Sequence, residues 1–308
     1  MNALQEKLGA RWWWATALSL LAFVGVYVFA VRTYLGQYLE DSALLGAEQV
    51  DKPEVLESLD TLHTISVFSL VLVILAVGVV GLLRRSPRVA FASASVIVAS
   101  ILTTEALKKI ILQRPDLVNI YPDATHNSFP SGHTTIGMVI VIALLLAVSY
   151  AWRGPVMLLT LFWGVSIGAA TITASWHRLS DTIGADLVVL FFGSLAALWL
   201  LKGGAIKREP ARSYPLRTVL AVILSVVAVG ALVVGAILAI KTVQFWDLLP
   251  QLEAARQAGA APHLTAHEDP QFTYNLFLAA QSLALAFSSL AALWFWATFH
   301  RLSTGPAS

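Results

Sequence analysis

Long uncharged, apolar runs recur along the whole chain and constrain its fold more than any other sequence feature. A helix that crosses a membrane needs about 20 consecutive apolar residues. Five runs meet this requirement without a charged residue: 12–31, 65–83, 134–152, 154–176 and 218–240. Three further runs complete the set: 89–112, 182–201 and 274–299. The sequence therefore predicts an all-α integral membrane protein with about eight spans.

Composition agrees with this prediction. Of the 308 residues, 57% are hydrophobic and 12% are charged, whereas soluble domains carry about 25% charged residues. The net charge of +2 gives no indication of nucleic-acid binding, and the absence of cysteine excludes disulfides and thiolate chemistry. The first run is too long for the core of a cleaved signal peptide, so we expect it to be a retained helix.

The distribution of lysine and arginine predicts how the helices are oriented. If both termini are cytoplasmic, the inner segments hold most of the basic residues and the outer segments hold many acids. Lys108, Lys109, Arg114 and Arg178 are basic residues on the outer side, against this bias. We therefore expect these four to have a local function at the extracytoplasmic surface of a multi-pass protein of the cell membrane.

The chain divides into three parts. Residues 12–201 would form a six-helix core, 202–217 a basic linker with glycine and proline, and 218–300 a C-terminal pair of membrane helices. Two outer segments, 33–62 and 241–271, are long enough to hold short surface helices or a lid. No soluble domain is expected.

Three polar clusters fall at the predicted outer surface. The first runs from Lys108 to Asp116, the second is Ser128-Phe-Pro-Ser-Gly-His-Thr-Thr, and the third runs from Ser175 to Asp181. Together they offer what a phosphate monoester, with its charge of about −1.5 to −2, requires.

Each cluster supplies a different part of this chemistry. Arg114 can donate two parallel hydrogen bonds to phosphate oxygens, and a lysine adds a point charge. Ser131 and Gly132 open a helix whose free N–H groups attract anions. His133 and His177 can divide the roles of nucleophile and general acid. Asp181, four residues after His177, can fix the tautomer of that ring.

These clusters resemble the signature of the type 2 phosphatidic acid phosphatase superfamily of membrane lipid phosphatases: K-x6-R-P, then P-S-G-H, then S-R-x5-H-x3-D. The resemblance covers roughly residues 12–201. It implies that His177 attacks phosphorus, that His133 protonates the leaving oxygen and that Asp181 orients His177. It also implies that Lys108, Arg114, Ser131 and Gly132 bind the phosphate, without a metal or another cofactor.

Two departures from the signature stand out. Only five residues separate Lys108 from Arg114, and Lys109 is closer still, so either lysine could be the phosphate ligand. The arginine expected six residues before His177 is Thr171. We expect Arg178, which follows His177 directly, to replace that missing cation; the alternative is that Arg178 only anchors the chain among lipid headgroups.

The expected function is metal-independent hydrolysis of a lipid phosphate or diphosphate, such as a polyprenyl diphosphate or phosphatidate, through a phosphohistidine. Two alternatives remain open: transfer of the phosphoryl group to an acceptor other than water, and a lipid-binding protein whose site has decayed. The expected partners are the lipid phosphate and the surrounding membrane lipids. His263 and His267 have the i, i+4 spacing of a metal pair but lack a third ligand, and Asp186 lies inside a predicted span, where a structural hydrogen bond is the simplest role.

Overall fold

The computed structural model describes residues 3–118, 120–121, 127–209, 214–243, 245–259 and 265–306. Each of the eight predicted runs overlaps a helix. These are α1 (Ala3–Val26), α4 (Val67–Leu83), α5 (Pro87–Ala106), α6 (Gly132–Ala147), α7 (Arg153–Thr173), α8 (Leu179–Lys202), α9 (Pro215–Thr242) and α11 (Pro270–Thr298). The all-α membrane fold is therefore confirmed.

By length and composition, six helices of the described part are able to cross a membrane. They are α1, α5, α7, α8, α9 and α11. Helix α4 passes the same test only together with α3 (Lys52–His63), to which it is joined at a bend of 55°. Helix α6 has 16 residues and is short for a span. The count of eight spans stays a prediction.

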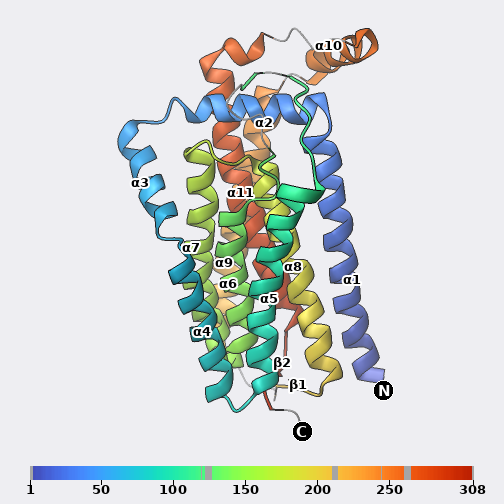
Figure 1. The fold of residues 1–308 in the computed structure, drawn as a ribbon, viewed down its shortest axis with the longest axis vertical. Coiled ribbons are helices and arrows are strands. Elements are labelled where there is room, and N and C mark those ends of the chain that lie inside the picture. The colour runs from blue at the N-terminus through green and yellow to red at the C-terminus, as the bar shows by residue number, and fades with distance from the viewer. Residues whose placement is uncertain are drawn as a thin grey trace.

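Short elements cap the two ends of the bundle (Figure 1). Helix α2 (Tyr34–Ala47) lies across one end, and α10 (Phe245–Ala258) lies at the same end. Both fall within the outer segments in which we expected short surface helices. The two termini lie at the opposite end, with strands β1 (Ile206–Arg208) and β2 (Leu302–Thr304). The side of the membrane that each end faces remains a prediction.

Helix α6 forms the centre of the bundle, since almost all of its residues from Thr134 to Ala147 are buried. Glycines permit one of its close contacts: a Cβ on Gly137 would lie 3.1 Å from the Cα of Gly164 on α7. A small residue at such a crossing lets two backbones approach, as is common in membrane helix pairs. Helix α6 thus carries its N-terminal residues on a rigid support.

Of the two C-terminal helices, α11 packs against the core more extensively than α9 does. Helix α11 contacts α2, α6, α7 and α8, and its Ser288 donates a 2.8 Å hydrogen bond to Asp186 of α8. Asp186 therefore makes the structural hydrogen bond that its position suggested. Helix α9 buries only Leu220, Leu224, Ala228 and Gly235, and its packing is mainly against α11.

The predicted linker contains a short strand. Strand β1 lies within it and pairs antiparallel with β2, with Lys207 opposite Ser303. Arg153, which is fully buried, donates to the Leu302 carbonyl at 2.7 Å. Two arginines, Arg84 and Arg153, also bind the hydroxyl of Thr304. The end of the chain is thereby attached to the α4–α5 turn and to the start of α7.

Candidate active site

The three polar clusters converge at the end of the bundle that α2 covers, and hydrogen bonds to backbone carbonyls hold them together. Asn127 donates to the carbonyls of Lys108 and Leu112, at 3.0 Å each, which joins the first cluster to the second. The N–H of Ser131 donates to the Asp181 carbonyl at 2.9 Å, which joins the second to the third. The predicted clusters therefore form one site.

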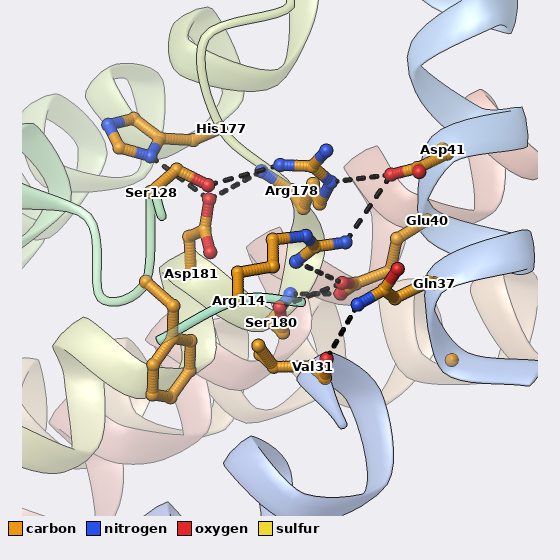
Figure 2. Close-up of polar contacts among 12 residues, drawn as sticks. Val31, Gln37, Glu40, Asp41, Arg114, Ser128, His177, Arg178, Ser180 and Asp181 are labelled. Carbon is orange, nitrogen blue, oxygen red and sulfur yellow. Dashed lines mark hydrogen bonds and ion pairs between the residues drawn. The ribbon is translucent and has the colours of Figure 1, made fainter. Parts of the chain in front are cut away.

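His177 and Asp181 form a buried pair. Nδ1 of His177 lies 3.1 Å from Oδ2 of Asp181, which also accepts a 3.0 Å hydrogen bond from the N–H of Arg178. Asp181 is fully buried. An Nδ1–H that donates to a carboxylate leaves the lone pair on Nε2, and Figure 2 shows that nitrogen pointing away from Asp181. The geometry therefore leaves Nε2 as the ring nitrogen of His177 that is not directed at Asp181.

His133 lies beside this pair. It is the second residue of α6, and its ring centroid is 6.4 Å from that of His177 and 5.5 Å from that of Trp176. A group bound between the two imidazoles would be within reach of both.

The N-terminus of α6 opens into the same space. Ser131 is the N-cap, and its hydroxyl accepts a 3.2 Å hydrogen bond from the N–H of Thr134. A Cβ on Gly132 would lie 3.1 Å from Oε1 of Glu105 and 3.4 Å from Nζ of Lys108. Glycine at this position therefore leaves room for charged groups beside the free N–H groups of the helix.

The side chains of Lys108 and Lys109 differ in exposure and in their position relative to the site. Helix α5 ends in a π-helical turn, Leu107–Ile111, that contains both of them, and such turns are frequent at functional sites. Both lysines pair with Glu105, at 3.0 Å for Lys108 and 2.7 Å for Lys109. The Lys108 side chain is 18% exposed and lies against Gly132, whereas that of Lys109 is 69% exposed. Lys108 is thus the lysine that borders the site.

Arg114 and Arg178 meet two acids that the sequence had not assigned to the site (Figure 2). Asp41 of α2 accepts from Arg178 Nε at 2.7 Å and from Arg114 Nη2 at 3.3 Å. Glu40, next to it, lies 3.6 Å from Arg114 and accepts from the N–H and hydroxyl of Ser180 at 2.8 and 2.9 Å. All four charged side chains are at most 10% exposed.

The α2 acids had been counted only as outer negative charge. Their spacing carried a further signal: Gln37, Glu40, Asp41 and Leu44 are at positions i, i+3, i+4 and i+7, which is one face of a helix. That face is docked on the Arg114-Pro115 segment, where Gln37 donates to the Pro115 carbonyl at 2.6 Å. The pattern indicates a polar, buried face and does not reveal its partners.

The charged groups of this cluster shift one another's pKa values. Burial raises the pKa of Glu40, although Arg114 opposes this effect. Burial alone would lower the pKa of Arg178, but Asp41, Asp181 and Glu40 outweigh it and the pKa is raised. Arg178 therefore stays charged, and its guanidinium also donates to Ser128 Oγ at 3.2 Å.

Thr171, in the place of the missing arginine, has a structural role. It is fully buried, and its hydroxyl donates to the Gly168 carbonyl at 2.7 Å. Its own carbonyl accepts from the N–H groups of Trp176 and His177, at 3.0 and 3.1 Å. Thr171 thus helps to position the turn that carries His177.

The C-terminal helices also reach this region. A cavity of about 130 Å³ lies against His177 and Arg178, and its other walls include Glu40 of α2, Ala239 of α9 and Leu276 of α11. Among the described residues, no group of three or more potential metal ligands occurs. His263, one of the two loop histidines, lies outside the described residues.

Comparison with protein families gives one finding: residues 89–205 match the family described as the PAP2 superfamily. The matched segment begins in α5 and ends just after α8, so it contains all three polar clusters. No curated protein and no solved structure matches the chain.

Proposed function

Through residues 89–205 the chain belongs to the PAP2 superfamily, a family of phosphatases, and we propose that it hydrolyses a lipid phosphate or diphosphate through a phosphohistidine on His177. The observation that carries this proposal is the buried His177–Asp181 pair with His133 beside it. Two imidazoles and one carboxylate can perform both halves of such a reaction, so no metal is assigned a role.

In the first half, Nε2 of His177 attacks phosphorus, and the bond from phosphorus to the lipid oxygen breaks. His133 gives its proton to that oxygen, so the leaving group departs as an alcohol or, from a diphosphate, as a protonated phosphate. In the second half, His133 takes a proton from water, the water oxygen attacks phosphorus, and the bond to Nε2 breaks. The His177 ring becomes positively charged when Nε2 bonds to phosphorus, and the Asp181 carboxylate stabilises that charge.

The phosphate oxygens would be bound by Lys108 and by the N–H groups at the start of α6, including that of Gly132. Ser131 caps the helix and holds these groups in place. We assign Arg114 and Arg178 to the same oxygens, in exchange for part of their contact with Asp41.

The direct test is phosphate release from lipid phosphates by the purified protein in detergent. We expect release from at least one of polyprenyl diphosphate, phosphatidate and phosphatidylglycerol phosphate, unchanged by EDTA and blocked by vanadate, which imitates five-coordinate phosphorus. Activity that is lost on chelation and restored by a divalent ion would contradict the mechanism. Transfer of phosphate to an added alcohol without release into water would instead identify a phosphotransferase.

Arg178 can be tested separately. We expect Arg178→Lys to lower kcat/KM at least tenfold, or about 1.4 kcal/mol, because lysine lacks the planar fork that binds two phosphate oxygens. Asp41→Asn, which removes the competing carboxylate and keeps both arginines, should tighten inhibition by inorganic phosphate. If Arg178→Ala keeps kcat/KM within twofold of the parent, a loss below ~0.5 kcal/mol, Arg178 is no ligand.

We also propose that the site faces the extracytoplasmic side, where a lipid headgroup would reach it from the bilayer. The chain has no cysteine, so single cysteines can be labelled without background. Asp51→Cys, at the α2 end, should react with an impermeant maleimide in intact cells, and Lys207→Cys in β1 only after lysis. The reverse pattern would place the substrate in the cytoplasmic leaflet.

A further inference from the structure

A second and much larger cavity lies at the opposite end of the bundle from the candidate active site. Its volume is about 1,120 Å³, and its walls come mainly from the start of α9 and the last turns of α11. These helix ends lie near the chain termini (Figure 1). Small-molecule pockets usually measure about 300–1,000 Å³, so this cavity can hold a large ligand.

One end of this cavity is basic. Arg11, Arg217, His300 and Arg301 line it, and none of its described lining residues is acidic. The three arginines of this set, without a carboxylate beside them, favour an anion, because their like charges repel one another until a counter-charge binds.

Arg217 is built into this end. Its guanidinium lies 4.1 Å from the ring centroid of Tyr150 and 4.8 Å from that of Trp296. Two aromatic faces fix the plane of the guanidinium and leave its N–H groups for a ligand at the edge.

Two donors at this end are buried and unsatisfied. Among the described residues, Nη1 of Arg217 and Nε1 of Trp296 have no hydrogen-bond partner. Buried donors are nearly always paired, and an exception calls for a missing acceptor. A shift of the Arg217 side chain toward the cavity would bring Nη1 within reach of an anionic oxygen.

The rest of the cavity is apolar and long. Ala221, Ser225 and Val229 follow Arg217 along α9 at intervals of one turn, opposite Leu290 and Leu293 of α11. The twelve helical steps from Arg217 to Val229 span about 18 Å. A ligand with a charged head and a hydrocarbon tail matches both ends, and a soluble anion matches only one.

We propose that this cavity binds an anionic phospholipid from the leaflet on the side of the termini, with its phosphate at Arg217 and one acyl chain between α9 and α11. A lipid there would join α9, which packs mainly against α11, to the end of the core. The site shares no residue with the three polar clusters, and the proposal does not depend on the proposed phosphatase activity.

The test is lipid binding by the full-length protein in a neutral detergent. We expect phosphatidylglycerol to raise the Tm and to remain bound in native mass spectrometry, and expect phosphatidylcholine to do neither. Arg217→Gln should weaken phosphatidylglycerol binding at least tenfold. The matched control is Arg85→Gln, which changes an exposed arginine of the α4–α5 turn and should leave binding unchanged.

A second variant covers the case in which Arg217→Gln fails to fold. Ser225→Trp would fill the apolar part of the cavity and keep all of its cations, and it should also lose the bound lipid. Equal binding of phosphatidylcholine, or unchanged phosphatidylglycerol binding in both Arg217→Gln and Ser225→Trp, would overturn the proposal. Stabilisation by inorganic phosphate that Arg217→Gln removes, without binding of phosphatidylglycerol, would show a plain anion site and would overturn it as well.

Discussion

Replacement of His177 by alanine is expected to remove lipid phosphate hydrolysis almost completely, by at least ~10⁴-fold in kcat. The reason lies in the proposed mechanism: Nδ1 of His177 lies at Asp181, so the attack falls to Nε2, and Asp181 cannot act in place of His177 because it is fully buried. The initial rate of phosphate release measures this effect.

The matched control for this substitution is His267→Ala. His267 lies in the short η5 helix (Ala266–Glu268), where its ring contacts Tyr38, and in the described part of the chain no hydrogen bond or ion pair joins it to the three polar clusters. It should keep the parent rate. Rapid quenching with a radiolabelled substrate should place the label on the His177 peptide of the parent protein. A label on another residue, or turnover in His177→Ala within tenfold of the parent, would refute the covalent mechanism.

The helices and the three polar clusters could be predicted from the sequence, and the reason is physical. Both are local patterns: an apolar run of helix length has few alternatives in a membrane, and a Ser-Gly pair at a helix start fixes its own backbone. The hydrogen bond of Asp181 to His177 is also local, four residues along one turn.

The partners of the arginines could not be predicted, because they are distant in the chain. Asp41 and Arg178 are separated by 137 residues, and a helix face gives no information about what it covers. Arg178 itself has an extended backbone, with φ −97° and ψ 167°, so its side chain and that of His177 leave the chain in different directions. Figure 2 shows the Arg178 guanidinium directed to Asp41, away from the His177 ring.

The same limit applies at the other end of the molecule. Residues 202–217 read as a linker because they are basic and rich in breakers, yet β1 forms there by pairing with residues at the end of the chain. Arg217 meets Tyr150 and Trp296 in the same way, through contacts made only in the folded bundle. Short strands and aromatic contacts of this kind depend on which helices become neighbours.

The second large effect concerns His133. We expect His133→Ala to slow cleavage of a lipid monophosphate by ~10²–10⁴-fold, the usual value of general acid catalysis. The alkoxide that leaves from such a lipid is a strong base and needs a proton as its bond to phosphorus breaks. His133 is the titratable side chain beside His177 from which that proton can come.

The leaving group distinguishes this role from a structural one. p-Nitrophenol is acidic enough to depart without a proton, so p-nitrophenyl phosphate should lose far less activity in His133→Ala than the lipid does, with little change in KM for either. A variant that merely disturbs the start of α6 would lose both activities equally, because phosphate binding itself would fail. Equal losses on the two substrates would therefore remove His133 from the role of general acid and leave it as a residue that positions the helix.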